Sequence, residues 1–228
     1  MNTGTAKLPD LNVLTMDDYQ HVYEPSDDTF LLCDALEGDR AEFVQYRPRM
    51  ILEIGCGSGC VITFLAQLLR DEGIHAHCLA VDLNPVAART TQKLALHNGV
   101  YVDVVQTHLV NGLSRLQHNH VDVLLFNPPY VPTPLEEVGQ PGITASWAGG
   151  EDGRVVIDEF LPLLDGLLSP SGRCYLILVE ENKPKEIMQY VQERGMQAQI
   201  IRRRKAVNEA LMVVKIWKES SSLLSKVT

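Results

Sequence analysis

Several features that mark membrane, secreted or metal-binding chains are missing from this sequence. No apolar run reaches the roughly 18 residues that cross a bilayer as a helix. The first residues, Met1 to Thr5, have no basic patch followed by an apolar core, so no secretory signal is expected. An odd number of cysteines without any C-x-x-C pair disfavours a disulfide framework and a zinc site; they are Cys33, Cys56, Cys60, Cys78 and Cys174. We expect free thiols in the reducing cytoplasm, and no metal.

Basic residues are also fewer than acidic ones, with 20 Lys and Arg against 29 Asp and Glu and a formal net charge of −9. An acidic chain is poorly suited to non-specific binding of phosphate backbones, which needs clustered cations. One cluster exists, Arg202 to Lys205, and we interpret it as a charged strand at a sheet edge. Nucleic-acid binding or nuclear import is the alternative. Neither nucleic acid nor a membrane is the expected partner, and a nuclear location stays open beside the cytoplasmic one.

The 228 residues contain no internal repeat, low-complexity tract or dividing linker, and they suit one α/β domain. We expect a flexible arm over 1–22, a single domain over 23–218 and a frayed tail over 219–228. Short, mostly apolar segments predict buried strands over 50–54, 78–81, 102–106, 121–126 and 174–179, and two further strands are expected over 199–203 and 210–217. Helical spacing predicts helices over 61–70, 85–98, 155–168 and 183–194. The alternation indicates a doubly wound, mostly parallel seven-stranded sheet that ends in an antiparallel hairpin.

A glycine-rich turn follows the first expected strand, in the segment Glu53 to Gly59. In open α/β sheets, ligands bind outside the carboxyl ends of the strands, where this turn lies. A dinucleotide site has the spacing G-x-G-x-x-G, whereas the spacing here is G-x-G-x-G. The acidic Glu53 beside the turn suits a ligand with a cationic amino-acid end better than one with phosphates. The alternative is a tight turn that holds no ligand.

Asp82 ends the second expected strand. A carboxylate accepts hydrogen bonds only, so it can bind both hydroxyls of a ribose. The alternative role is a negative charge at the start of the helix that begins at Pro85. Together with the glycine turn, we favour the ribose contact.

The segment Asn127-Pro128-Pro129-Tyr130 comes directly after the fourth expected strand. The prolines fix the backbone and remove two donors, so the Pro128 carbonyl and the Asn127 side chain become free acceptors. Two acceptors beside the flat ring of Tyr130 can bind an NH₂ group on a planar system. Hydrogen bonds to that NH₂ group would favour charge build-up on nitrogen during attack on a methyl group. The alternative is a rigid turn without a chemical role.

These segments together resemble the class I S-adenosylmethionine (SAM)-dependent methyltransferases that carry an Asn-Pro-Pro-Tyr active site. Other stretches make the sequence similar to the short eukaryotic HemK-type protein-glutamine methyltransferases; they are Val22 to Leu32, Asn127 to Pro134 and Ala145 to Arg154. The resemblance extends from Tyr23 to Trp217 and identifies 23–218 as the methyltransferase domain.

The resemblance implies SAM as the cofactor and a set of residues that contact it. Glu53 and Gly55 would contact its methionine part and Asp82 its ribose; the full set is Thr29, Glu53, Gly55, Gly57, Asp82, Leu83, His108, Leu109 and Asn127. The family usually has an acid-Leu pair after the third strand, where the acid binds the adenine amino group, but this chain has His108-Leu109. A neutral histidine accepts only one hydrogen bond, and a half-exposed loop histidine is the alternative.

The implied reaction is methylation of the side-chain amide of the glutamine in the Gly-Gly-Gln motif of a class-one translation release factor. Asn127, Pro128 and Tyr130 would be catalytic, and Pro129 would join them in the substrate site. A protein lysine is a lower-ranked additional acceptor. Val131 to Gly150 would shape the substrate groove, with Trp147 either in that groove or in the core. The resemblance also implies a small zinc-binding activator subunit. The alternatives are a nucleic-acid adenine-N6 methyltransferase and a non-catalytic SAM-binding regulatory subunit.

Overall fold

The computed structural model describes residues 6–139, 142–206 and 209–218. The expected tail over 219–228 lies outside the described residues, as does the start of the expected arm. The strands are β1 (Met50–Ile54), β2 (His77–Asp82), β3 (Asp103–Gln106), β4 (Val121–Phe126), β5 (Leu168–Leu178), β6 (Met196–Lys205) and β7 (Ala210–Lys218). The α-helices are α1 (Asp27–Gly38), α2 (Arg40–Tyr46), α3 (Cys60–Asp71), α4 (Pro85–His97), α5 (Val155–Phe160), α6 (Leu164–Leu167) and α7 (Pro184–Gln192).

One seven-stranded sheet carries the fold, in the order β3-β2-β1-β4-β5-β7-β6. The first five strands are parallel, and β7 is antiparallel to both β5 and β6. The predicted sheet with its C-terminal hairpin is therefore confirmed. The basic cluster lies on β6, at one edge of the sheet, as the sequence indicated.

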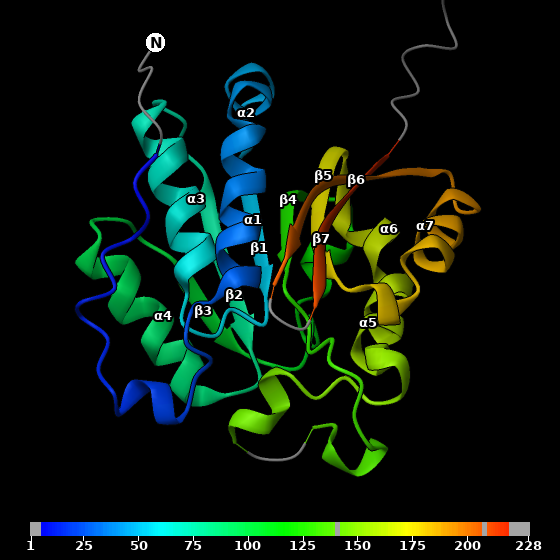
Figure 1. The fold of residues 1–228 in the computed structure, drawn as a ribbon. Coiled ribbons are helices and arrows are strands. Elements are labelled where there is room, and N and C mark those ends of the chain that lie inside the picture. Colours follow the sequence, from blue (N-terminus) through cyan, green and yellow to red (C-terminus); the bar gives the residue numbers. More distant parts are fainter. Residues whose placement is uncertain (1–5, 140–141, 207–208, 219–228) are drawn as a thin grey trace, which may run out of the picture.

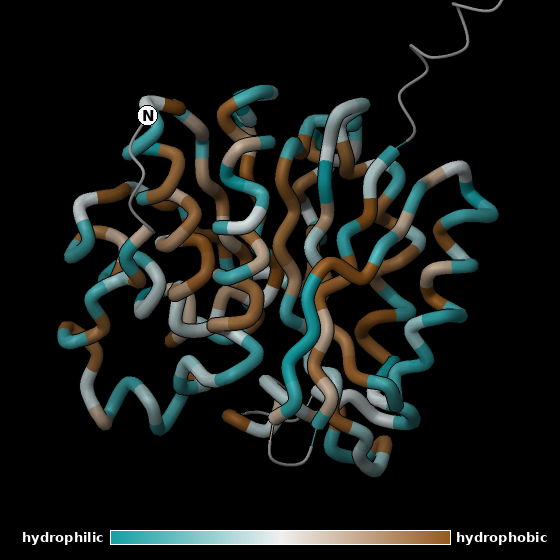
Figure 2. The backbone as a smooth tube through the Cα atoms, turned by 45° about the horizontal axis from the view of Figure 1, so that its top comes forward, coloured by the Kyte–Doolittle hydropathy of each residue, from teal (hydrophilic) through white to brown (hydrophobic). Residues whose placement is uncertain are grey.

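Helices cover both faces of the sheet, with α1 to α4 on one side and α5 to α7 on the other (Figure 1). Central strands are buried from both sides, which explains why their sequences are apolar without alternation. Figure 2 shows the tube through these strands as mostly hydrophobic, whereas the last residues of β6 are hydrophilic. All five cysteines are buried free thiols. No helix in the described ranges is long and apolar enough to cross a membrane.

The prediction of one helix over 155–168 is wrong for its second half. The helix breaks after α5 into a 3-10 turn, Leu161–Leu163, and the single-turn helix α6. Pro162 explains the break, because its nitrogen has no hydrogen to bond the preceding turn. Strand β5 begins as early as Leu168, which pairs with Val121 before the register shifts and Val123 faces Arg173.

Residues 6–22, the described part of the expected arm, follow the outer side of α4. Lys93 Nζ donates to Asp18 Oδ2 at 2.8 Å, and the Asp10 amide donates to Asn98 Oδ1 at 2.7 Å. Leu14 is buried and packs with Leu94. This contact brings the chain to the start of α1, beside the carboxyl ends of the central strands (Figure 1).

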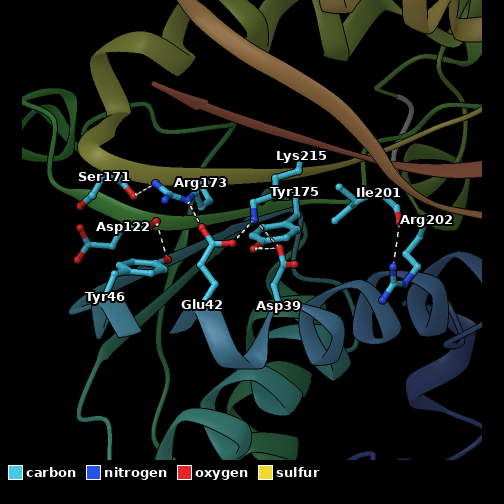
Figure 3. Close-up of polar contacts among 10 residues, drawn as sticks. All are labelled: Asp39, Glu42, Tyr46, Asp122, Ser171, Arg173, Tyr175, Ile201, Arg202 and Lys215. Carbon is cyan, nitrogen blue, oxygen red and sulfur yellow. Dashed lines mark hydrogen bonds and ion pairs between the residues drawn. The ribbon is translucent and has the colours of Figure 1, made fainter. Parts of the chain in front are cut away.

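A polar network attaches the junction of α1 and α2 to the sheet (Figure 3). Lys215, which is 9% exposed on β7, donates to Asp39 at 2.7 Å and also to Glu42. Asp39 accepts a second hydrogen bond from the Tyr175 hydroxyl at 2.7 Å, and Arg173 donates to Glu42 at 2.7 Å. Each buried charge thus has an opposite charge or donor beside it, as burial requires.

Candidate active site

A cavity of about 1020 Å³ opens at the carboxyl ends of the parallel strands. Its walls come from the glycine turn after β1, the ends of β2 and β3, the segment after β4, and the start of α1. In Figure 1 this edge is at the bottom, where the light-green segment between β4 and α5 passes below the sheet. The volume is at the upper end of the range for small-molecule sites, which is about 300–1,000 Å³. It is large enough for a nucleoside-sized ligand and part of a second molecule.

The glycine turn combines two requirements. Gly55, Gly57 and Gly59 have φ values of 67°, 50° and 81°, in the left-handed region that favours glycine. Gly59 is also at a close approach, because a Cβ atom there would lie 2.7 Å from the Thr91 Cα. Gly57 has open space on that side. Gly59 therefore allows α3 to pack on α4, while Gly55 and Gly57 line the cavity and leave their backbone accessible to a ligand.

Glu53 is 3% exposed and lies where β1 reaches the cavity. Its Oε2 accepts a hydrogen bond from the Ile62 amide in the first turn of α3, at 3.1 Å. Burial raises the pKa of Glu53 well above its usual range, because no described lysine or arginine compensates its charge in the cavity. A cationic ligand group would supply the missing compensation.

Asp82 lies at the end of β2 and binds the backbone on two sides. Its Oδ2 accepts from the Gly57 amide at 2.9 Å, and its Oδ1 accepts from the Asn84 amide at 2.8 Å. Asn84 caps α4 by accepting from the Val86 amide at 2.9 Å. Burial raises the pKa of Asp82, and these amide donors oppose the shift. Each carboxylate oxygen keeps a further lone pair for a ligand hydroxyl, so the two roles weighed from the sequence are compatible.

Asn127 is held by a residue that the sequence did not indicate. Its Nδ2 donates to Asp28 Oδ2 at 2.9 Å, and Asp28 is only 3% exposed, in the first turn of α1. A carboxylate cannot donate, so this contact fixes the amide with its nitrogen toward Asp28. The Asn127 Oδ1 is buried and has no hydrogen-bond partner in the described part of the chain. An unpaired buried acceptor costs about 1–3 kcal/mol, so the site is prepared for an external donor.

Tyr130 is 8% exposed and lines the cavity with Pro129. Its hydroxyl lies 3.3 Å from Asp28 Oδ2 and 3.3 Å from Glu209 Oε2. Burial raises the pKa of Tyr130, so the hydroxyl keeps its proton. Burial also raises the pKa of Glu209, which lies just before β7. Pro128 is buried and does not line the cavity, unlike the other three residues of this segment.

The segment after Tyr130 is fixed from behind. Asn182, which is fully buried, donates through Nδ2 to the Tyr130 carbonyl at 2.8 Å and to the Asp152 carbonyl at 2.9 Å. A Cβ atom on Gly153 would lie 1.8 Å from the Tyr130 carbonyl oxygen, so only glycine fits there. The glycines near residue 150 thus support the Asn-Pro-Pro-Tyr backbone. Trp147 is half-buried and lines the cavity.

The remaining predicted contacts line the same cavity. Thr29 is buried, and its Oγ1 accepts from the Ser26 amide at 3.4 Å in a helix cap. Leu83 is 53% exposed and leaves an apolar surface facing the cavity. Leu109 has a φ of 48°, a left-handed conformation that leucine rarely adopts. His108 is beside it and lies 2.9 Å from Glu159.

The charge of the cavity wall selects the kind of ligand. Among the described residues, no lysine or arginine lines the cavity, whereas carboxylates do; they are Asp27, Asp28, Glu53, Asp82, Glu159 and Glu209. Such a wall repels phosphates and attracts cations. It fits a ligand with an ammonium and a sulfonium group, and not a dinucleotide. No group of three or more metal-ligating side chains occurs in the described ranges.

The comparisons with known proteins agree with this geometry. Residues 51–137 match the model of a methyltransferase domain. Mouse "Methyltransferase HEMK2" is 48% identical over 200 residues, covering 88% of this chain and 91% of that protein. "eRF1 methyltransferase catalytic subunit mtq2" of Schizosaccharomyces pombe is 36% identical over 229 residues, covering 94% and 97%.

A solved structure gives the same result at the level of the fold. The E. cuniculi Mtq2–Trm112 complex, described as responsible for methylation of the eRF1 translation termination factor, has a TM-score of 0.64 and 30% identity. The match covers 87% of this chain and 99% of that one. The chain belongs to the HEMK2/Mtq2 family of methyltransferases.

Proposed function

We propose that this chain transfers a methyl group from SAM to the side-chain amide nitrogen of the glutamine in the Gly-Gly-Gln motif of a class-one translation release factor. The observation that carries the proposal is the Asn127 side chain, whose Oδ1 is buried without a donor while Asp28 holds its Nδ2. A primary amide offers two N–H donors in one plane. One of them would complete the hydrogen bonds of Asn127.

The other cavity residues support the cofactor half of the proposal. SAM supplies an electrophilic methyl group when bound. Glu53 would pair with its ammonium group, Asp82 would accept from its ribose hydroxyls, and Leu83 and Leu109 would cover its base. The relatives support the substrate half, because the Schizosaccharomyces pombe protein is named for its action on eRF1. The acidic wall argues against a nucleic-acid substrate.

The residues around the acceptor nitrogen would stabilise the positive charge that develops on it during methyl transfer. An amide nitrogen is a weak nucleophile because its lone pair is delocalised. Attack on a methyl group, with S-adenosylhomocysteine as the leaving group, would make it positive until it loses one of its two protons to water. The Asn127 Oδ1 would accept a hydrogen bond that strengthens as this charge develops. Asp28 places a carboxylate beside Asn127, and its hydrogen bond to Nδ2 keeps the amide from rotating. The Pro128 carbonyl stays a predicted second acceptor.

Labelled SAM and a purified release factor test the substrate. We expect label in the release factor and none after Gln→Ala in its Gly-Gly-Gln motif. Asn127→Ala should lower turnover on the order of 10²-fold or more, because one charge-stabilising contact is lost, while SAM affinity stays within about threefold. Asn111→Ala, on an exposed loop outside the cavity, is the matched control. Label that persists after the Gln→Ala change would refute the substrate.

A small zinc-binding subunit is the proposed partner, since the E. cuniculi relative was solved as a complex with Trm112. The edge strand β3, which pairs only with β2 among the described residues, is the proposed docking position. Leu96 and Tyr101 beside it are 65% and 70% exposed, whereas the opposite edge strand β6 is charged. An edge strand with apolar neighbours is suited to pairing with another chain.

Co-purification tests this position. Leu96→Asp together with Tyr101→Asp should abolish recovery of the partner, since charges would enter an apolar interface. Leu135→Asp, at a residue that is also 65% exposed, is the control and should leave the complex intact. Unchanged recovery of the partner with the double variant would place it elsewhere.

A further inference from the structure

A histidine and a glutamate from distant parts of the chain meet on the wall of the cavity. His108 follows β3, and Glu159 lies on α5, on the other face of the sheet. His108 Nε2 is 2.9 Å from Glu159 Oε2, and both side chains line the cavity. The histidine is 42% exposed and the glutamate 52%. Both are therefore accessible to a ligand.

The carboxylate determines how the imidazole can bind. Glu159 only accepts hydrogen bonds when ionised, so His108 Nε2 must carry the hydrogen that joins the two groups. In a neutral imidazole the other nitrogen, Nδ1, then has the free lone pair. Glu159 thereby makes His108 an acceptor for the ligand. Without this contact both tautomers would be populated, and one of them would present a donor at Nδ1.

The surroundings of the pair indicate a flat, amino-bearing ring. Leu83, which is 53% exposed, and Leu109 provide apolar surfaces on the same wall. Asp82, the proposed ribose contact, ends the neighbouring strand, because β2 pairs with β3. A base attached to that ribose would reach the loop after β3, where His108 lies.

We propose that His108 accepts a hydrogen bond from the exocyclic amino group of the adenine base, and that Glu159 is the positioning residue that sets its tautomer. This inference rests on the proposed function, since it requires SAM as the cofactor. The carboxylate comes from α5 and acts through the imidazole, so the choice of base depends on two residues 51 positions apart.

Two demethylated cofactor analogues test the assignment without turnover. S-adenosylhomocysteine has the amino group, whereas S-inosylhomocysteine has a carbonyl oxygen in its place. By calorimetry we expect the wild type to bind the adenosine compound roughly 10-fold more tightly, the effect of one hydrogen bond and one unpaired acceptor. His108→Ala should reduce this preference to about twofold or less, and His108→Asp should restore it, because a carboxylate also accepts from an amino group.

Glu159→Ala separates positioning from packing. The freed imidazole can present a hydrogen at Nδ1, so affinity for the inosine compound should rise relative to the adenosine compound, which lost packing alone would not cause. Asp158→Ala is the matched control: it is the adjacent residue on α5, 51% exposed and ion-paired with Arg154, and it does not line the cavity. It should keep the wild-type preference.

The outcomes are distinguishable. Equal binding of the two compounds by the wild type, or a preference that survives His108→Ala, overturns the assignment and leaves the proposed methyl transfer intact. A Glu159→Ala variant with the wild-type preference overturns the positioning role. Failure of the wild type to bind either compound overturns both the assignment and the proposed cofactor.

Discussion

Asp28 and Asn127 share a hydrogen bond of 2.9 Å across 99 residues of sequence, and this contact determines which end of the Asn127 amide faces the ligand. The carboxylate takes the NH₂ end, so the carbonyl end is left without a donor. Asp28 therefore fixes the orientation of the Asn127 amide, so that the amide presents an acceptor to the ligand. The Tyr130 hydroxyl lies 3.3 Å from the same Asp28 oxygen and helps to hold the carboxylate in place.

Replacement of Asp28 tests this relationship. In Asp28→Ala the Asn127 amide can rotate and offer its nitrogen to the substrate, so we expect turnover to fall about 10- to 100-fold, the range for loss of a hydrogen bond to a charged group. SAM affinity by calorimetry should change less than about threefold. Asp34→Ala, an exposed residue on the same helix that pairs with Arg204, is the control. Turnover that is unaffected in Asp28→Ala would remove Asp28 from the active site.

Asp82 has a structural and a ligand-binding role, and two variants separate them. Asp82→Ala removes the acceptors of the Gly57 and Asn84 amides, so it should lower both thermal stability and SAM affinity. Asp82→Asn keeps one acceptor oxygen and loses the charge. We expect it to lower SAM affinity by about 1.5–3 kcal/mol, the value of a charge-assisted contact, with a smaller loss of stability than Asp82→Ala. Equal SAM affinity in Asp82→Asn and wild type would contradict the ribose contact.

The sequence predicted the centre of the sheet well because β1, β2 and β4 are short apolar runs that end near glycine or proline. It did not predict α1 from its residues, and the reason is physical. This helix packs against both the sheet and the neighbouring helix α3, so its apolar residues do not follow one stripe. Polar residues that are buried for the site, such as Asp28, interrupt the pattern further.

Some residues of the candidate site could be predicted from the sequence, and others could not. Gly55, Asp82 and Asn127 could be predicted because each ends or directly follows a strand, and strand ends meet at one edge of a parallel sheet. Asp28, Glu159 and Glu209 could not, since they reach the cavity from a helix start, a helix on the other face and a hairpin turn. Their placement depends on tertiary packing, which no local pattern contains. A carboxylate next to a predicted contact, as Asp28 is to Thr29, was the only available signal.

Glu53 should couple SAM binding to pH. Burial raises its pKa in the free protein, and a cationic ligand would lower it again, so binding should release a proton. SAM affinity should therefore rise with pH until Glu53 is ionised in the free protein. Calorimetry in two buffers with different ionisation enthalpies measures the released proton. In Glu53→Gln the pH dependence should vanish and SAM affinity should fall. The same dependence in both proteins would assign it to another group.

For the same residue, folding stability should change with pH in the opposite direction to SAM affinity: it should fall as pH rises. A carboxyl group with a raised folded pKa contributes stability below its unfolded pKa and loses it as pH rises through the folded value. The ligand-free wild type should therefore lose stability with rising pH relative to Glu53→Gln, which is neutral and can still accept from the Ile62 amide. The test compares the thermal stability of the two ligand-free proteins from about pH 5 to about pH 9, around the usual stability maximum. A flat difference across this range would contradict the raised pKa.

Lys215 holds two carboxylates, and its loss should destabilise the fold without altering the site. In Lys215→Met, Asp39 and Glu42 keep their charges beside an apolar side chain, and we expect a loss of about 2 kcal/mol by urea unfolding. This is below the 3–5 kcal/mol for a fully buried pair, because the two carboxylates are 22% and 31% exposed. Lys218→Met, on the same strand but paired with the exposed Asp165, should cost less than about 1 kcal/mol.

The acid response identifies Glu42 as the partner that matters. Burial raises the pKa of Glu42, but hydrogen bonds from Lys215 and Arg173 outweigh it and lower the pKa below its ordinary value of 4.5. A depressed carboxyl pKa contributes stability above the ordinary value and loses it as pH falls through the folded value. The wild type should thus lose stability below about pH 4.5, and Lys215→Met should lose less there, because its Glu42 pKa is higher. Glu42→Gln added to Lys215→Met should recover part of the loss at neutral pH. If the wild type and Lys215→Met lose stability equally on acidification, the ion pair of Glu42 is not the cause of the loss.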